Sequence, residues 1–189
     1  MRSRQTNKPD KYIVSECAKV LRDELPYNLH IFVNSVEFIA KVIDTLKLAP
    51  EAVKIVCSTS GDSRQENQRK LGNAYPIGQP SDPAKKINFY TSTCFEGCDI
   101  FDPDGVTFIV SDGRKAHTLL DISTLFTQIC GRIRDSRYKA QIVHVYSTTK
   151  YSKTVTLDEF VAATQRTLAD AESYAAEINS LSEATRVKT

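Results

Sequence analysis

Residues 87–99 read Ile-Asn-Phe-Tyr-Thr-Ser-Thr-Cys-Phe-Glu-Gly-Cys-Asp, an apolar run that ends in hydroxyl side chains and continues into a glycine-containing loop. A short run of aromatic and branched residues bounded by turn residues is typical of a buried strand. Hydroxyls and a glycine at the end of such a strand let a phosphodiester or a nucleotide approach closely. The stretch therefore predicts a strand over residues 87–91, followed by a loop suited to phosphate.

Apolar runs of the same kind recur along the chain, and segments with helical spacing separate them. The further predicted strands cover residues 30–33, 53–57, 106–110 and 140–146. The predicted helices cover residues 11–25, 36–46, 64–71 and 119–134, and Ser35 carries the hydroxyl that a helix N-cap favours. Strands that alternate with helices indicate βαβ units with right-handed crossovers, so the predicted fold class is α/β with a mostly parallel sheet.

This pattern divides the chain into two regions. Residues 1–150 contain every predicted strand and form an α/β domain, and residues 151–189 form a helical extension. Within the extension, an alanine-rich stretch from Leu157 to about Ser182 has apolar residues at helical spacing, which predicts a long amphipathic helix. Such a helix packs on a core more often than it binds a partner, and both uses are left open.

The bulk composition limits the class of protein. Hydrophobic residues make up 41% and charged residues 25% of the chain, as in a folded domain rather than a disordered one. No apolar run approaches the roughly 18 residues of a membrane span, and the basic stretch 1–11 lacks the apolar segment of a secretory signal. We therefore expect no membrane contact and a cytoplasmic location, in a bacterium or in the host cell of a phage or virus.

The five cysteines are odd in number and scattered, which favours buried reduced thiols. Cys94 and Cys98 lie four residues apart, but no partnering cysteine or histidine pair has zinc spacing, so no metal is assigned. His30, His117 and His144 lack a triad pattern and are interpreted as structural. The net charge of +2 argues against a histone-like clamp and is compatible with a local basic face.

A second distinctive stretch is Gln128-Ile-Cys-Gly-Arg-Ile-Arg134, which places a glutamine and two arginines around one glycine on a predicted helix. Guanidinium groups are fixed-charge forks that suit phosphate. The chain has no G-x-x-x-x-G-K-[ST] loop to hold a nucleoside triphosphate. The two stretches together indicate a protein that works on phosphates but binds the triphosphate chiefly elsewhere.

The order of these strands and motifs resembles the second RecA-like domain of superfamily 2 helicases, over roughly residues 30–146. Residues 30–35 resemble helicase motif IV, a strand that ends in a small polar residue. Residues 91–99 resemble motif V, whose pattern is T-x5-G-x-D, and residues 128–132 resemble motif VI, whose pattern is Q-x-x-G-R-x-x-R. The short G-R-I-R-D form is similar to herpesvirus-type origin-binding helicases and to phage or plasmid replication proteins. The implied fold is a RecA-like, three-layer αβα domain.

The resemblance implies a nucleic-acid contact at the ends of two strands. Thr91 and Ser92 would contact a backbone phosphate, and Asn34 and Ser35 would contribute from the motif IV position. The implied partners are nucleic acid, with DNA favoured, and an N-terminal RecA-like domain.

The resemblance also implies a nucleotide face. Gly97 would allow close approach to the nucleotide, and Asp99 would meet the ribose or relay to motif VI. Gln128 and Arg132, around Gly131, would face ATP and Mg²⁺ held mainly by the preceding domain. An arginine there would stabilise charge on the γ-phosphate, and hydrolysis would switch the two domains between closed and open forms.

One position departs from the family pattern. The second arginine of motif VI should fall at position 135, where this chain has Asp135, flanked by Arg134 and Arg137. On a helix, a shift of one residue turns a side chain by about 100°. We favour Arg134 as the replacement, because the origin-binding type has this spacing.

Simpler interpretations exist for each group. Arg132 and Arg134 are also favourable near a helix C-terminus because of the helix dipole. Thr91 and Ser92 are also common turn residues, and Asp99 also suits a loop.

The leading hypothesis for the function is the second motor domain of an ATP-dependent helicase or translocase, inactive alone. The alternative is a stand-alone, catalytically silent RecA-like module that binds nucleic acid or protein. A small-molecule α/β enzyme fits less well, since a glycine-rich βα turn is absent.

Overall fold

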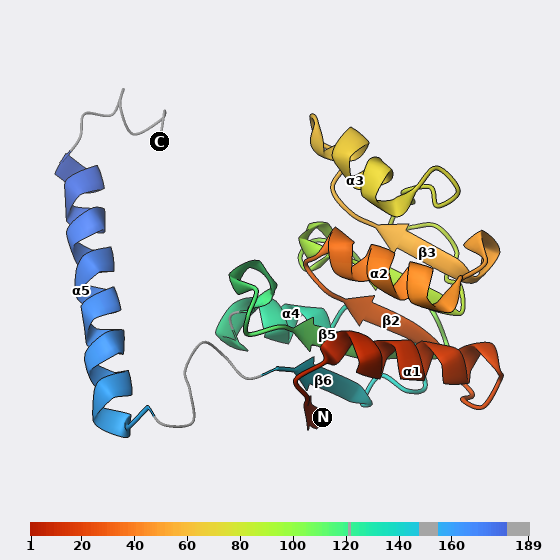
Figure 1. Cartoon of the computed structure of the whole chain (residues 1–189), viewed down its shortest axis with the longest axis horizontal. Coiled ribbons are helices and arrows are strands. Elements are labelled where there is room, and N and C mark those ends of the chain that lie inside the picture. Colours follow the sequence, from red (N-terminus) through yellow and green to blue (C-terminus); the bar gives the residue numbers. More distant parts are fainter. Residues whose placement is uncertain (121, 148–154, 181–189) are drawn as a thin grey trace. The chain divides into compact units, whose positions relative to one another are not determined.

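Six parallel strands form one sheet in the order β1-β6-β5-β2-β4-β3 (Figure 1). Their bounds are β1 Arg2–Gln5, β2 Asn28–Phe32, β3 Val53–Val56, β4 Ile87–Tyr90, β5 Gly105–Ser111 and β6 Ile142–Tyr146. The predicted α/β class is confirmed, and the sheet is parallel throughout rather than mostly. The sequence predicted all of these strands except β1, an edge strand whose four residues are all exposed and none of which is apolar.

Within residues 1–147, helices connect the strands and cover the sheet. Their bounds are α1 Pro9–Leu21, α2 Val36–Leu46, α3 Ser63–Leu71 and α4 Thr127–Cys130. A further helix, α5 Leu157–Ser180, comes after the last strand in the sequence. Pro9 occupies the first turn of α1, where its missing N–H costs no hydrogen bond. Ser35 caps α2 as predicted, since its side chain accepts a hydrogen bond from the Phe38 backbone N–H at 3.2 Å.

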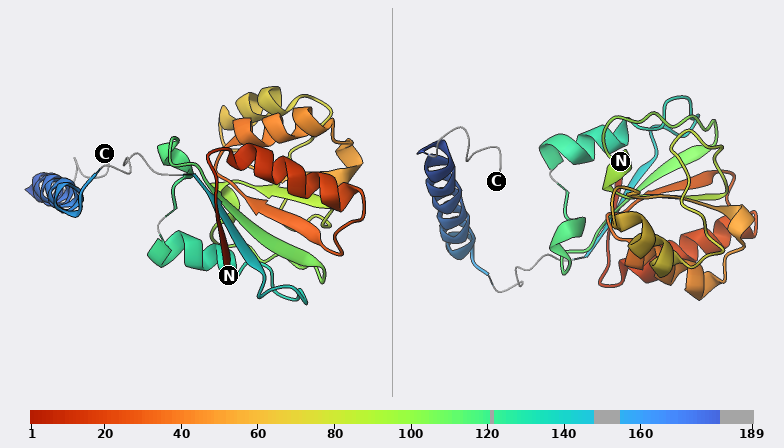
Figure 2. Two further views of the ribbon diagram at one scale, coloured as in Figure 1. Left: turned by 60° about the horizontal axis from the view of Figure 1, so that its bottom comes forward. Right: turned by 90° about the horizontal axis from the view of Figure 1, so that it is seen from above.

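Alternate residues along the central strands face two separate apolar clusters. In β2, Leu29 and Ile31 pack in the cluster that includes residues of α1 and α2, whereas Phe32 packs in a second cluster with Phe126 and Ile129. Figure 2 shows α1, α2 and α3 on one side of the sheet. The sheet is therefore covered on both faces, which makes this a three-layer α/β fold.

The prediction of a single helix over residues 119–134 is wrong. The chain instead forms a π-helical turn at Ile122–Phe126, then the short helix α4, which ends at Cys130 with Gly131 as its C-cap. Beyond it, Ile133 makes a parallel bridge with Ile100 and is 4% exposed. At this point strand-like hydrogen bonds to Ile100 replace the hydrogen bonds of a helix, and Ile133 becomes buried. Arg132 and Arg134 therefore lie outside any helix.

The structure describes residues 1–120, 122–147 and 155–180. It divides into two compact units, Met1–Lys150 and Tyr151–Thr189, which are considered separately. The second unit contains α5, whose start is fixed by a capping box: the Thr156 N–H donates to Glu159 Oε2 at 2.8 Å, and the Glu159 N–H donates to Thr156 Oγ1 at 3.3 Å. The predicted continuation to Ser182 lies outside the described residues. Among the described helices, none has the length and apolar character needed to span a membrane.

Candidate functional site

The carboxyl ends of the parallel strands share one edge of the sheet, where ligands of open α/β sheets usually bind. The connection after β2 runs to α2 on one face, and the connection after β5 runs through residues 122–130 on the other face. These neighbouring strands therefore form the topological switch point of the sheet. Asn34 lies at this point, two residues after the end of β2.

Asn34 joins the loops that follow three strands. Its Nδ2 donates to the backbone oxygen of His117, after β5, at 2.9 Å, and its Oδ1 accepts from the backbone N–H of Ser92, after β4, at 3.3 Å. Ser92 is exposed at the start of a 3-10 turn. The structure thus brings together two of the four residues predicted to contact nucleic acid.

Thr91 and Ser35 are less accessible than their predicted role suggests. Thr91 is 5% exposed, and its hydroxyl lies 3.1 Å from that of Thr93, which is exposed. Ser35 is 7% exposed, and its hydroxyl is used by the α2 cap. Thr93 is a hydroxyl of the same run that the sequence interpretation did not select, although its exposure suits a ligand better.

The loop after β4 turns at Gly97, whose φ of +70° lies in the left-handed region that glycine adopts readily. A side chain added at Gly97 would meet no atom within 4 Å. The glycine is thus explained by backbone conformation rather than by close packing within this unit. Phe95, two residues earlier, is buried and anchors the loop on the sheet.

Backbone hydrogen bonds bring the motif V and motif VI stretches together. The Ile100 N–H donates to the Arg132 oxygen at 2.9 Å, and the Arg134 N–H donates to the Ile100 oxygen at 3.0 Å. The side chains add to this contact, since Arg134 Nε donates to Asp99 Oδ1 at 2.7 Å. Residues more than 30 positions apart therefore form one surface, which contains the predicted Asp99, Arg132 and Arg134.

The two arginines have different surroundings. Arg132 is half-buried, and two backbone oxygens hold its guanidinium. Its Nε donates to the backbone oxygen of Gln128 at 3.1 Å, and its Nη1 donates to the backbone oxygen of Cys98 at 3.0 Å. No carboxylate lies within ion-pair distance of Arg132 in the described ranges, so its charge is fixed in place and uncompensated. Arg134 is instead paired with Asp99, and both side chains are about half exposed, which makes this ion pair weak.

Gln128 and Gly131, the other predicted residues of the motif VI stretch, belong to α4 and its C-cap. Gln128 lies in α4 and is half-buried, and its backbone oxygen accepts from the Gly131 N–H at 3.1 Å. Gly131 has φ of −97°, and an added side chain would make an ordinary contact at 3.6 Å. The conformation therefore does not require glycine at this position.

Asp135, which stands where the family has its second arginine, has a structural partner. Its Oδ1 accepts the backbone N–H of Asp102 at 2.8 Å and so ties the end of the motif VI stretch to the loop before β5. Arg137 is mostly exposed and pairs with Asp104. A carboxylate at position 135 thus stabilises the contact between the two stretches, and Arg137 is neutralised by a neighbour.

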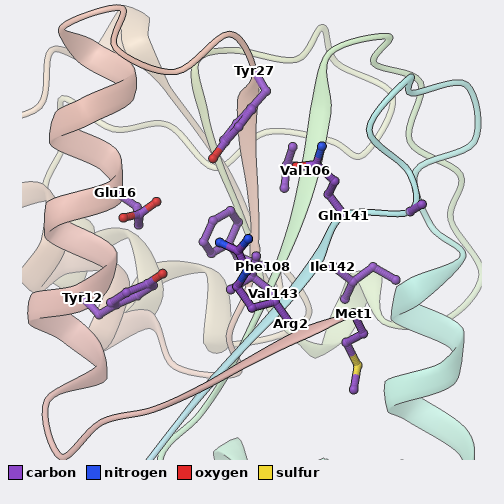
Figure 3. A pocket seen from close by; sticks show the side chains of 11 residues that line it. Met1, Arg2, Tyr12, Glu16, Tyr27, Val106, Phe108, Gln141, Ile142 and Val143 are labelled. Carbon is purple, nitrogen blue, oxygen red and sulfur yellow. The ribbon is translucent and has the colours of Figure 1, made fainter.

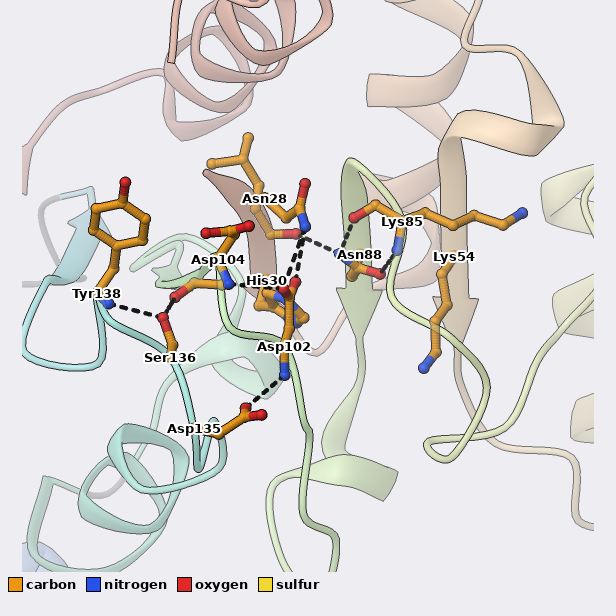
Figure 4. A network of polar contacts seen from close by, with 12 residues as sticks. Asn28, His30, Lys54, Lys85, Asn88, Asp102, Asp104, Asp135, Ser136 and Tyr138 are labelled. Carbon is orange, nitrogen blue, oxygen red and sulfur yellow. Dashed lines mark hydrogen bonds and ion pairs between the residues drawn. The ribbon is translucent and has the colours of Figure 1, made fainter. Parts of the chain in front are cut away.

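A buried polar network lies behind this surface; the sequence interpretation took His30 as structural but did not identify its partners (Figure 4). Asp102 is 4% exposed and accepts from His30 Nε2 at 2.8 Å and from Asn28 Nδ2 at 3.0 Å. His30 Nδ1 lies 3.1 Å from the Tyr90 hydroxyl. A neutral imidazole that donates from Nε2 to Asp102 and accepts at Nδ1 from the Tyr90 hydroxyl satisfies both contacts. The only signal in the sequence is a histidine inside an apolar strand.

Burial and pairing set the protonation states in this network. Burial lowers the pKa of His30, and the hydrogen bond to Asp102 opposes that change only in part. For Asp102, burial acts to raise the pKa, but the hydrogen bonds from His30, Asn28 and the Asp104 backbone outweigh it and leave the pKa lowered. We therefore assign a neutral His30 beside an ionised Asp102 near neutral pH.

The polar group around Asn34 and the charged group around Arg132 are joined through residues 92–98, not by direct side-chain contacts. Arg132 fits a phosphate, since its guanidinium is held by neutral oxygens and keeps its charge. Within the described ranges, no group of three or more histidine, cysteine or acidic side chains could hold a metal ion. Arg132 therefore fits one side of a phosphate site.

Comparison with known protein families, with characterised proteins and with solved structures finds no match to this chain. The assignment of function consequently depends on the geometry and on the motif resemblance.

Proposed function

We propose that this chain is the second, RecA-like motor domain of an ATP-dependent nucleic-acid helicase or translocase, working in the cytoplasm. The observation that carries the proposal is the contact between residues 97–100 and 132–134, through the Ile100–Ile133 bridge and the Asp99–Arg134 pair. Motif V and motif VI are distant in sequence, and a shared nucleotide face requires them to be adjacent. The switch-point position of Asn34 supports the proposal further.

In this proposal, the two groups of residues have separate roles. Asn34, Ser92 and the neighbouring hydroxyls bind the backbone of a nucleic acid, DNA in preference to RNA. Arg132 reaches ATP and Mg²⁺ held by a preceding RecA-like domain, and stabilises charge on the γ-phosphate as phosphate transfer proceeds. Asp99 and Arg134 link the nucleotide face to the nucleic-acid loop.

A second candidate function is a catalytically silent RecA-like module that binds nucleic acid or protein. The pairing of Arg134 with Asp99, together with Asp135 at the second arginine position, favours it, since Arg132 is then the one arginine of described residues 128–134 without an ion pair. The two candidates share the fold and differ in whether Arg132 acts on ATP.

Steady-state ATP turnover by the full-length gene product tests this difference. Arg132→Ala should lower turnover by roughly 1,000-fold or more, the size expected for an arginine finger, while the circular dichroism spectrum is unchanged. Arg137→Ala is the matched control, because it removes an exposed arginine five residues away and should leave turnover within about twofold. Unchanged turnover in Arg132→Ala would remove Arg132 from the site. A gene product without ATP turnover that still binds nucleic acid would support the silent module.

A further inference from the structure

A pocket of about 380 Å³ lies at the opposite, amino edge of the sheet from the candidate site. Ile142 and Val143 of β6 are partly exposed and provide apolar contact surface, and the buried Val106 and Phe108 of β5 lie beneath it. Arg2 of β1, Tyr12 and Glu16 of α1, and Tyr27 before β2 complete the wall (Figure 3). This size falls within the range of small-molecule sites, and an apolar pocket with a few convergent polar groups is their usual form.

The polar groups of the pocket converge on one place. Figure 3 shows the Tyr12 and Tyr27 hydroxyls and the Glu16 carboxylate pointing into the space beside the Arg2 guanidinium. Burial, and then the charge of Glu16, raise the pKa of both tyrosines, so the hydroxyls remain protonated donors at neutral pH. Neither hydroxyl has a hydrogen-bond partner in the part of the chain that the structure describes.

The charges of the pocket favour an anion. Glu16 is ionised but paired, since its carboxylate accepts from Lys19 Nζ at 2.6 Å. Arg2 has no carboxylate within ion-pair distance among residues 1–120, 122–147 and 155–180. A second cation lies nearby, because the Arg4 guanidinium is 5.7 Å from the centre of the Tyr12 ring. The pocket thus combines an unpaired guanidinium and two free hydroxyl donors with an apolar wall.

We propose that this pocket binds a small amphipathic anion, with its apolar body against Ile142 and Val143 and its acidic head group on Arg2, Tyr12 and Tyr27. The head group is a carboxylate or a phosphate ester, both of which accept hydrogen bonds from a guanidinium and from hydroxyls. The site is independent of the proposed motor function, which uses the other edge of the sheet.

The test uses 8-anilinonaphthalene-1-sulfonate, an aromatic body with one anionic group, titrated into the full chain carrying any purification tag at its C-terminus. We expect a saturable fluorescence increase with one site per chain. Arg2→Gln should raise the Kd roughly tenfold, as expected for loss of a charge-assisted contact. Tyr27→Phe removes one donor only and should raise the Kd roughly threefold.

Lys11→Gln is the matched control, because it removes one positive charge from an exposed position of α1 and should leave the Kd unchanged. Octanoate and octyl phosphate should displace the probe, and the tighter of the two identifies the head group; inorganic phosphate at equal ionic strength should not displace it. Equal Kd values for the wild type, Arg2→Gln and Tyr27→Phe would overturn the proposal. Non-saturable binding, or displacement by inorganic phosphate as effective as by octanoate, would overturn it as well.

Discussion

Replacing Asp102 by asparagine should destabilise the sheet-containing unit by about 2 to 3 kcal/mol. The two carboxylate oxygens accept from His30 Nε2 at 2.8 Å, from Asn28 Nδ2 at 3.0 and 3.3 Å, and from the Asp104 N–H at 2.9 Å. Asparagine keeps one acceptor oxygen and turns an NH₂ group toward these donors. His30 must then adopt the other tautomer or leave one donor without an acceptor, and the charge-assisted character of the remaining hydrogen bonds is lost; together these changes cost about 2–3 kcal/mol.

Urea denaturation, followed by near-ultraviolet circular dichroism of the tyrosines, measures this change, since the chain has no tryptophan. The midpoint of thermal unfolding should fall by roughly 5 to 10 °C, as expected for a domain of about 150 residues. Asp23→Asn is the control, because Asp23 is 79% exposed in its pair with Lys86 and should matter by less than about 0.5 kcal/mol. An Asp102→Asn protein as stable as the wild type would refute the network described above.

Three further predictions follow from the described contacts. Burial lowers the pKa of His30, so the unfolded chain binds this proton at a higher pH than the folded chain does. The free energy of unfolding should therefore have its full value above about pH 7.5 and fall by up to about 1.4 kcal/mol per pH unit below about pH 6.5. His30→Asn should reduce this pH dependence in urea titrations at several pH values. Part of the pH dependence should remain, because burial also lowers the pKa of His144. Ser35→Ala should cost about 1 kcal/mol in the same assay through loss of the α2 cap, and an unchanged stability would contradict that role. Gly97→Ala should cost about 1 kcal/mol from its positive φ alone, and a gain in stability would contradict the left-handed conformation of residue 97.

The interior of the sheet was predictable because its strands are continuous apolar runs. Parallel strands buried on both faces carry such runs, as at residues 106–110, and each was found within one or two residues of its predicted bounds. The predicted helix over 36–46 was also found, since the Ser35 cap and the apolar spacing agree. Local sequence patterns were enough to predict these elements because the tertiary packing favours the same secondary structure.

The errors arise where tertiary contacts outweigh local preference. β1 is a short, exposed and polar edge strand, so its pairing with β6 leaves no apolar pattern in the sequence. The predicted helix over 119–134 was wrong because burial of Ile133 against Ile100 is a contact between distant residues. The His30–Asp102 pair joins residues 72 positions apart, and periodicity carries no information at that separation.

ATP turnover by the full-length gene product, with and without single-stranded DNA, tests the central claim most directly. The proposal predicts that DNA stimulates turnover several-fold, that Ser92→Ala combined with Asn34→Ala reduces this stimulation, and that the 189-residue chain alone shows no turnover. Turnover by the isolated chain, or turnover in the full-length product that is indifferent to nucleic acid, would contradict it.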